Sequence, residues 1–591
     1  MCGIVGAFSL DGVSPVSADL VARMNETLRY RGPDDGGVHV RGPIGLGNRR
    51  LAIVDRAFGR QPMPNPEATR WITYNGEVYN YRELRTELEA RGYRFRTHSD
   101  TEVVLHAYDA YGQACVERFN GQFAFAVWDE REGELFLARD HLGISPLHYA
   151  VADGLFLFAS EAKALFAHPG LEPRIDPEAI AEALLCGTLF AGRSMFHGVQ
   201  ALEPGTRLTV GTNGVRKAVY WDIPLREDPP RSEAEYADQM LPLLEDALRI
   251  RVPEEVPWGL MLSGGTDSST LVHMARGMSA TPPQTFTIDF PNPWKGKDMD
   301  VYYARLLADR LGTRHREFLI APDDYYDLLR EVTWHVERPF NKGAVTMYML
   351  YRQIQQHATV VITGEGADEL FAGYVGSRGL GLDEVVETGQ ITRLPWAAYW
   401  EDMARLFSGD FKRRVRPKEL LQERLADSLR RANSLDPLNN ALYLYSKYFL
   451  LELLELHDRT SLAFGVEARL PFIDRRYVEL LSPMPSIHKY RDGQTKYLFK
   501  QRVRELLPAE IVARGKTPMP IPRDPRTIAA QVALTRELLL SPDSRSACYY
   551  DLARVGEFLE GRGAFEGISM LAVWKVSMYL VTLELLHREY P

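Results

Sequence analysis

Apolar runs separated by Gly, Pro and Asn turns extend through the first 205 residues of the chain. Runs of this kind, rich in β-branched and aromatic residues, predict strands at 3–8, 70–76, 123–129, 134–139 and 155–160. Helical spacing of apolar residues occurs near 17–30, 80–92 and 100–112. The pattern therefore predicts strands packed face to face, with helices on the outside.

The pattern changes after a turn-rich stretch at 205–233, which we interpret as containing a linker. Beyond it, the sequence predicts strands at 257–262, 284–290, 314–319 and 359–363, and helices at 268–278, 300–311 and 323–357. Alternation of strand and helix is typical of a parallel sheet with helices on both faces. From residue 380 onward the pattern is mostly helical.

Composition narrows the class of protein. The 591 residues are 45% hydrophobic and 25% charged, which is typical of a globular protein with a large core. A net charge of −9 argues against a protein whose main task is to bind nucleic acid or anionic lipid. The 4 cysteines lie far apart and indicate neither a zinc cluster nor a disulfide scaffold. Since no apolar run reaches roughly 20 residues and the start lacks a basic region, we expect no membrane span, no signal peptide and a cytoplasmic location.

Cys2 is the first candidate for chemistry. A small second residue allows the initiator Met to be removed, which would leave the Cys2 thiol beside a free α-amine. Such an amine titrates near neutral pH and can act as the base for the thiol. Hydrolysis of an amide also needs an oxyanion hole, for which Asn75 and Gly76 provide a side-chain amide and a backbone N–H. Arg50 and Asp100 fit the carboxylate and the ammonium of an amino-acid substrate.

The motifs of residues 1–165 resemble, in order, those of N-terminal-nucleophile glutamine amidotransferase domains. They are MCGIVG, RGPD (31–34), RLAIVD (50–55), YNGEVYN (74–80), SDTE (99–102), FNGQFAFA (119–126) and ARDHLG (138–143). The resemblance implies an αββα sandwich, with Cys2 as nucleophile and with Asn75 and Gly76 as the oxyanion hole. It also implies a glutamine pocket made by Arg50, Leu51, Ile53, Val54, Asn75, Gly76, Glu77 and Asp100.

A second candidate site begins where the strand at 258–262 runs into the loop SGGTDSS (263–269). Small residues before a helix allow backbone N–H groups to cradle an anion. The loop carries Asp267 instead of the lysine of a P-loop, and a carboxylate beside phosphates implies that Mg²⁺ lies between them. The loop after the strand at 359–362 contributes Asp368 at the same sheet edge. Asp267 and Asp368 are therefore the predicted metal ligands.

Residues 515–517 read GKT but do not form a Walker motif, because Glu510 occupies the position of the required glycine. Lys516 is instead a candidate for neutralising an α-phosphate during adenylation.

The later motifs resemble the synthetase domain of asparagine synthetases, within the pyrophosphatase-loop ATP family. They are SGGTDS (263–268), GEGADELFAGY (364–374), RTSL (459–462), EARLPFID (467–474), TK (495–496) and RGK (514–516). The resemblance implies that Glu365 takes part in forming an acyl-adenylate and that Lys516 stabilises it. It implies an ATP site made by Leu262, Ser263, Gly264, Gly265, Asp267, Ser268, Ile288, Thr363 and Gly364.

The two halves together predict an amidotransferase that adenylates a carboxylate with ATP and aminates it with ammonia from glutamine, giving AMP and pyrophosphate. The resemblance favours aspartate as the acceptor and implies Mg²⁺ with ATP. The predicted units are a glutaminase domain (1–210), a linker (211–232) and an α/β synthetase domain with a parallel sheet and a helical C-terminal region (233–591). The expected partners are small molecules, with no nucleic acid and no membrane, and a homodimer is one option for the assembly.

Three alternatives remain open. The same chemistry on another carboxylate, as in natural-product pathways, is favoured by residues 375–390, which depart from the asparagine synthetase pattern. Asn341 and Lys342 are candidates for contact with the acyl substrate in either case. A non-catalytic scaffold is disfavoured by the intact set of candidate residues. A nucleic-acid-directed ATP pyrophosphatase is disfavoured by the net charge and by the glutaminase half.

Overall fold

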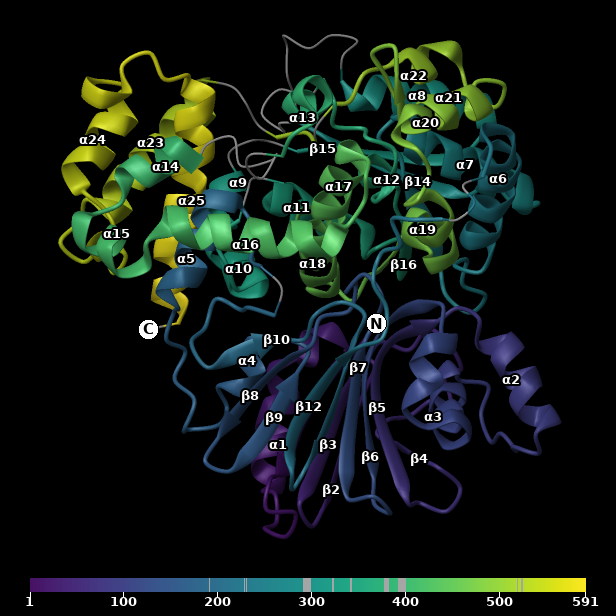
Figure 1. Cartoon of the computed structure of the whole chain (residues 1–591). Coiled ribbons are helices and arrows are strands. Elements are labelled where there is room, and N and C mark those ends of the chain that lie inside the picture. The colour runs from purple at the N-terminus through teal and green to yellow at the C-terminus, as the bar shows by residue number, and fades with distance from the viewer. Residues whose placement is uncertain are drawn as a thin grey trace.

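The computed structural model describes residues 1–190, 192–227, 229, 231–290, 299–320, 324–340, 343–376, 382–391, 400–517, 519–521 and 525–590. The chain forms two parts that lie one above the other, and the N-terminus lies near the boundary between them (Figure 1). Cys2, which belongs to the first part, therefore lies close to the second part as well.

The first part contains two antiparallel sheets of six strands each. One sheet has the order β10-β8-β9-β1-β3-β2, formed by β1 (Gly3–Ser9), β2 (Asp35–Arg41), β3 (Ile44–Arg50), β8 (His148–Ala152), β9 (Leu155–Ala159) and β10 (Val199–Ala201). The other has the order β12-β11-β7-β6-β5-β4, formed by β4 (Met63–Pro64), β5 (Arg70–Val78), β6 (Gly121–Asp129), β7 (Glu134–Arg139), β11 (Thr206–Gly211) and β12 (Gly214–Val219).

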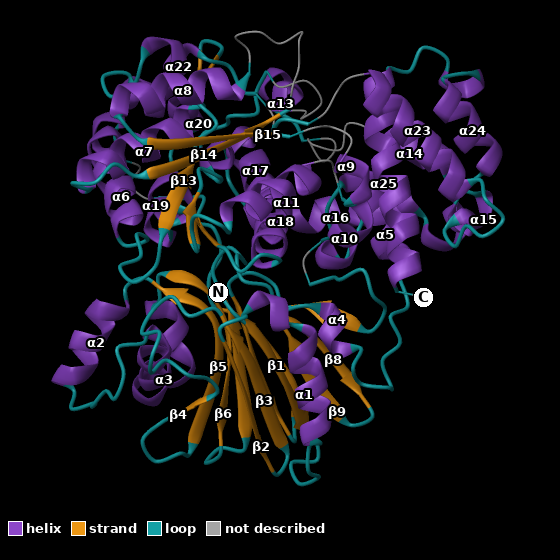
Figure 2. Ribbon diagram, turned by 180° about the vertical axis from the view of Figure 1, so that it is seen from behind, coloured by secondary structure: helices purple, strands orange, loops and turns teal. Residues whose placement is uncertain are grey.

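The two sheets pack face to face through alternate residues of their strands. Ile4 and Phe8 of the first sheet share a fully buried cluster with Ala124 and Ala126 of the second. The outer faces are covered by α1 (Ala18–Thr27) and α4 (Ala162–Leu165) on one side and by α2 (Tyr81–Ala90) and α3 (Asp100–Tyr111) on the other. The predicted αββα sandwich is thereby confirmed (Figure 2).

The stretch interpreted as a linker is shorter than predicted. The hairpin of β11 and β12 extends the second sheet to Val219, so the first nine residues of the interval 211–232 belong to the hairpin and its sheet. Ser232 then caps α6 (Glu233–Arg249) through a capping box with Glu235. The sequence reading missed this hairpin because its turn-rich composition resembles that of a loop.

The second part is built on a parallel sheet of five strands with the order β15-β14-β13-β16-β17. Its strands are β13 (Trp258–Met261), β14 (Gln284–Asp289), β15 (Arg314–Leu319), β16 (Val360–Ile362) and β17 (Glu467–Arg469). The strand order reverses between β13 and β16, and ligands of such sheets bind at the carboxyl ends of the strands at this point. The four strands predicted from the sequence are confirmed, whereas the short β17 was missed.

Helices cover both faces of this sheet and form the C-terminal region (Figure 2). Around the sheet they are α6, α7 (Thr266–Met278), α8 (Asp300–Leu311), α9 (Asp324–Asp327), α10 (Leu329–Val336), α11 (Gly343–Ile354), α12 (Ala367–Leu370), α19 (Arg475–Leu481), α20 (Ser486–Lys489), α21 (Tyr497–Val503) and α22 (Ala509–Ala513). The others are α5 (Pro177–Cys186), α13 (Leu382–Thr388), α14 (Trp400–Leu406), α15 (Gly409–Val415), α16 (Pro417–Ala432), α17 (Pro437–Leu444), α18 (Leu450–Leu462), α23 (Pro525–Leu539), α24 (Leu552–Glu560) and α25 (Met570–Glu589).

The helix predicted at 323–357 is divided into α9, α10 and α11. Glu337, just after α10, has a left-handed backbone with φ of 60°, which ends the helix. Within the described residues, no helix combines the length and the apolar character that crossing a membrane would require.

Candidate functional sites

Cys2 lies directly before β1 and is 6% exposed. Its backbone nitrogen donates to Asn75 Oδ1 at 2.5 Å, and Arg31 Nε donates to its carbonyl oxygen at 3.1 Å. Met1 is also buried, and its ammonium pairs with Glu467 of β17. The predicted nucleophile is thus fixed by Asn75 and Arg31 of its own sandwich, and Met1 beside it contacts the second part of the molecule.

The predicted oxyanion hole lies on β5. Asn75 is fully buried, and its Nδ2 has no hydrogen-bond partner among the described residues. Gly76 has a φ of +147°, and a Cβ there would lie 2.1 Å from the carbonyl oxygen of Gln122, so only glycine fits. An unpaired amide donor in the residue that contacts Cys2 is what stabilisation of a developing oxyanion requires.

The thiol of Cys2 needs a base. Burial raises its pKa, while the Met1 ammonium, the backbone N–H of Leu51 and Arg50 act in the opposite direction. A buried neutral thiol is a weak nucleophile. This environment is consistent with the predicted use of the Cys2 amine once Met1 has been removed.

The predicted glutamine-binding residues lie around this point, but several contact protein groups. Arg50 donates to the carbonyl oxygens of Val54, Asp55 and Arg56, so it holds the loop that follows β3. Leu51 and Ile53 of that loop pack against Met1.

The two acidic residues of this set, Asp100 and Glu77, also bond protein groups. Asp100 accepts hydrogen bonds from the Tyr74 hydroxyl at 2.7 Å and from the Val78 N–H at 3.2 Å. Glu77 pairs with Arg469 of β17. Burial raises the pKa of Glu77, and Arg469 acts against this rise.

The loop after β13 forms a compact turn before α7. Ser263 Oγ lies 3.1 Å from Ser268 Oγ, and the Gly265 N–H donates to Ser263 Oγ at 3.4 Å. Gly264 has a φ of +69°, and a Cβ there would lie 2.3 Å from Tyr303 Cβ. The turn therefore depends on glycine, and it directs the N-terminus of α7 towards the sheet edge.

The loop after β16 packs against this turn. A Cβ on Gly364 would lie 3.2 Å from the backbone nitrogen of Ser268. Thr363 is buried at the end of β16, while Leu262 and Ile288 are buried near the carboxyl ends of β13 and β14. The predicted ATP residues are thus brought to one edge of the sheet.

Two lysines join the acidic residues of the two loops. Lys496 contacts Asp267, and its Nζ lies 2.8 Å from Asp368 Oδ1; Lys516 contacts the other oxygen of Asp368. Burial would raise the pKa of Asp368, but Lys496 and Lys516 hold it well below its usual range. Burial raises the pKa of Asp267, against the effect of Lys496. The sequence reading included Lys496 in a motif but gave it no role.

Asp267 and Asp368 suit a divalent cation that also binds phosphate. Asp267 Oδ1 is buried without a hydrogen-bond partner among the described residues. No cluster of three or more His, Cys, Asp or Glu that could hold a metal occurs in the described part of the chain. A cation here would therefore take two ligands from the protein and the rest from phosphate oxygens and water, which is the usual pattern for Mg²⁺.

The structure also shows contacts between the glutaminase site and the second part of the molecule that were not predicted from the sequence. Arg31 bonds the Cys2 carbonyl and forms an ion pair with Asp458 of α18, with N–O distances of 2.7 and 3.0 Å. Glu467 and Arg469 of β17 contact Met1 and Glu77. No local pattern could reveal such pairs, since their partners are separated by hundreds of residues.

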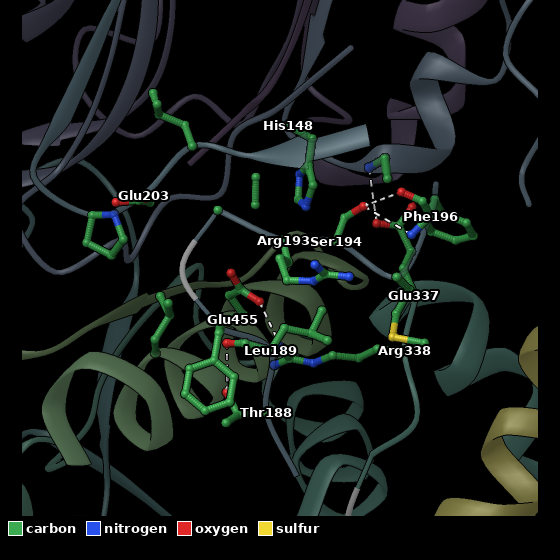
Figure 3. A pocket seen from close by; sticks show the side chains of 18 of the residues that line it. His148, Thr188, Leu189, Arg193, Ser194, Phe196, Glu203, Glu337, Arg338 and Glu455 are labelled. Carbon is green, nitrogen blue, oxygen red and sulfur yellow. Dashed lines mark hydrogen bonds and ion pairs between the residues drawn. The ribbon is translucent and has the colours of Figure 1, made fainter. Parts of the chain in front are cut away.

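A separate pocket lies between the two parts and contains none of the predicted site residues (Figure 3). Its charged side chains pair with one another: Glu455 lies 3.1 Å from Arg338 and 3.2 Å from Arg139, and Glu337 lies 2.9 Å from Arg459. Because these charged groups are already paired, they indicate an interface between the two parts and not a catalytic centre. Asn341, Lys342 and residues 377–381 of the divergent segment 375–390 lie outside the described residues, so the structure does not test these acceptor predictions.

Comparison with known proteins gives a consistent result. A family model described as a glutamine amidotransferase domain matches residues 1–221, and one described as asparagine synthase matches residues 239–588. Asparagine synthetase [glutamine-hydrolyzing] 3 of Bacillus subtilis is 31% identical, with 95% of this chain and 94% of that protein covered. Asparagine synthetase [glutamine-hydrolyzing] 1 of the same organism is 28% identical, with 98% and 96% covered.

Proposed function

Because the chain belongs to the glutamine-hydrolysing asparagine synthetase family, we propose that it converts aspartate to asparagine. The family reaction joins a carboxylate, ATP, glutamine and water to give an amide, AMP, pyrophosphate and glutamate. The observation that carries the proposal is the contact of Lys496 with both Asp267 and Asp368 at the switch point of the parallel sheet. It brings together a lysine that would offset the charge of a pyrophosphate leaving group and the two carboxylates that would hold Mg²⁺ against it.

In the first half of the reaction, the Cys2 thiolate attacks the side-chain amide carbon of glutamine. The α-amine exposed by removal of Met1 accepts the thiol proton, and the buried Asn75 Nδ2 together with the Gly76 N–H stabilises the oxyanion. The α-ammonium then gives this proton to the amide nitrogen, ammonia leaves, and water hydrolyses the γ-glutamyl thioester. Arg50, Leu51, Ile53, Val54, Glu77 and Asp100 would form the pocket around the substrate.

In the second half, a carboxylate oxygen attacks the α-phosphorus of ATP and pyrophosphate leaves. The turn from Ser263 to Ser268 would hold the phosphates by its backbone N–H groups. Lys516, whose side chain is 35% exposed, is positioned by its ion pair with Asp368 and would offset the charge of the α-phosphate. Asp267 and Asp368 would hold Mg²⁺, which supplies positive charge against the pyrophosphate.

Lys516→Ala should lower the rate of adenylation by about 100-fold while changing ATP affinity much less. A charge aimed at the transition state stabilises it more than the ground state, and losing one such donor costs roughly 3 kcal/mol. The measurement is ATP–pyrophosphate exchange at varied ATP. Lys418→Ala on α16, an exposed lysine remote in sequence from these loops, serves as the control. An unchanged exchange rate in the Lys516 variant would show that this lysine is only a surface charge.

The acceptor is tested by amide formation with aspartate and with larger carboxylic acids, at saturating ATP and glutamine. We expect asparagine and pyrophosphate to form in equal amounts with aspartate. Relatives only about 30% identical leave room for another acceptor, and residues 375–390 favour that alternative. If aspartate gives neither product while another acid gives both, the family chemistry stands and the acceptor is different.

We also propose two domains, a glutaminase domain at 1–210 and a synthetase domain at 233–591. The proposed location is the cytoplasm, and the proposed assembly is a homodimer. Support for the domains comes from the matched intervals 1–221 and 239–588.

A further inference from the structure

Arg31 of the first part holds the backbone of the proposed nucleophile. Its Nε donates to the carbonyl oxygen of Cys2 at 3.1 Å, and the Cys2 nitrogen donates to Asn75 Oδ1. When Met1 is removed, Cys2 loses its preceding peptide bond and becomes the end of the chain. The contacts with Arg31 and Asn75 then fix the groups on both sides of its Cα, and with them the places of the thiol and the α-amine.

The direction of Arg31 Nε depends on Asp458 of α18. The Asp458 carboxylate accepts hydrogen bonds from both terminal nitrogens of the guanidinium, at 2.7 Å from Nη1 and 3.0 Å from Nη2. A two-point contact of this kind fixes the plane of a guanidinium, and the Nε–H bond lies in that plane. Glu161 contacts Nη1 alone, at 2.6 Å, and a single contact leaves the plane free to rotate.

The pair of Arg31 and Asp458 is shielded from water, since both side chains are 0% exposed. A buried charge is costly unless it is paired, so Arg31 keeps this orientation while Asp458 lies beside it. Glu161 is shared with Lys163 and Arg459, which also bear positive charge. It therefore cannot compensate Arg31 in place of Asp458.

Asp458 belongs to the second part, and α18 lies at the boundary where the two parts meet (Figure 1). The residue before it, His457, lies 3.2 Å from Glu365 in the loop after β16. A displacement of the whole helix would disturb this loop and thereby adenylation, whereas a local change at Asp458 would not. The rate of ATP–pyrophosphate exchange therefore separates the two effects.

We propose that Asp458 is a positioning residue for glutamine hydrolysis, which orients Arg31 so that the thiol and the α-amine of Cys2 face the glutamine amide. The glutaminase site is then complete only when the second part is docked on the first. This assignment rests on the function proposed above and adds a residue of the synthetase part to the glutaminase site. Asp458 itself acts through Arg31 and takes no proton.

The test compares Asp458→Asn, which keeps the shape of the side chain and removes its charge, with Glu455→Gln on the same helix. Glu455 also crosses the boundary, since it lies 3.2 Å from Arg139 of the first part, but its ion pairs do not include Arg31. Each full-length variant is assayed for kcat and KM of glutamine hydrolysis and for labelling of Cys2 by a diazoketone analogue of glutamine. ATP–pyrophosphate exchange is measured with the acid that wild type converts.

Asp458→Asn should lower the kcat of glutamine hydrolysis and the limiting rate of Cys2 labelling by about 100-fold, the loss expected when a reacting group is misplaced by roughly 1 Å. The KM for glutamine should change by less than about threefold, because the hydrogen bonds of the Asp458 carboxylate go to Arg31 and not to the proposed glutamine pocket. Exchange should also stay within about threefold, and Glu455→Gln should resemble wild type in every assay.

Arg31→Lys provides a second comparison, since lysine keeps the charge and lacks the planar fork. This variant should lose glutamine hydrolysis as Asp458→Asn does. The double variant should be worse than Arg31→Lys by no more than about threefold, because two residues that act as a unit are not additive. Losses that multiply in the double variant would show that Asp458 does not act through Arg31.

An unchanged kcat in Asp458→Asn, an equal loss in Glu455→Gln, or an equal loss in exchange would overturn the proposal. If Asp458→Asn does not fold, Asp458→Glu decides by the same rates, because it keeps the charge and shifts the carboxylate by one methylene. We expect it to lose about 10-fold in hydrolysis alone. A wild-type protein that neither hydrolyses glutamine nor is labelled at Cys2 would instead refute the proposed function, whatever the variants show.

Discussion

Cys2→Ala should reduce glutamine-dependent amide formation by more than about 10⁴-fold and leave synthesis from added ammonium salt within about twofold of wild type. The alanine variant lacks the atom that forms the thioester, and loss of a nucleophile has effects of at least this size. The loops proposed to bind ATP lie on the parallel sheet of the other part and do not include Cys2. The measurement compares the two nitrogen sources at saturating ATP and acceptor.

Cys115→Ala is the matched control, since Cys115 is fully buried in the cluster behind β5 and should affect neither nitrogen source at saturation. Protein that retains Met1 should behave like Cys2→Ala, because the amine is then blocked, and mass spectrometry distinguishes the two forms. Failure of ammonium salt to restore synthesis in Cys2→Ala would show that the two parts do not divide the reaction as proposed.

Asp267→Asn and Asp368→Asn should each reduce ATP–pyrophosphate exchange by roughly 10³-fold while glutamine hydrolysis continues. Each change removes one of the two carboxylates that would hold Mg²⁺ against the pyrophosphate, and the charge stabilisation lost is several kcal/mol. It also leaves Lys496 with a single anionic partner. The measurement is exchange across a range of Mg²⁺ concentrations.

Asp410→Asn is a suitable control, because this aspartate on α15 is 89% exposed and lies far from the loops in sequence. Normal exchange in both variants would exclude these carboxylates as metal ligands. Release of ADP in place of AMP by wild type would contradict the assignment of the loop as a pyrophosphate loop.

The sequence was most informative where residues close in the chain form a single element. Strands such as β5 and β7 were predicted because their apolar runs are long and bounded by turns. The hairpin of β11 and β12 and the short β17 were not predicted. Most side chains of β12 are exposed, so the strand lacks an apolar run, and β17 has only three residues. β11 and β12 pair locally across the turn at Thr212 and Asn213, so their hairpin was open to prediction from the sequence, whereas β17 pairs with the distant strand β16.

The candidate sites show the same limit. Cys2, Asn75, Asp267 and Asp368 could be named because each occurs in a short motif whose chemistry requires that residue type. Lys496 and Arg31 bond partners that are distant in the sequence, so only the folded chain reveals their contacts. The missed residues are mainly those that hold the named ones in place or join the two parts.

In the proposed reaction, a carboxylate becomes an adenylate before it receives nitrogen from glutamine. The most direct measurement supplies the acceptor acid with an ¹⁸O-labelled carboxylate and glutamine with an ¹⁵N-labelled amide. We expect one ¹⁸O atom in the phosphate of AMP and ¹⁵N in the amide product. AMP without ¹⁸O, or ¹⁸O in inorganic phosphate alongside ADP, would contradict it.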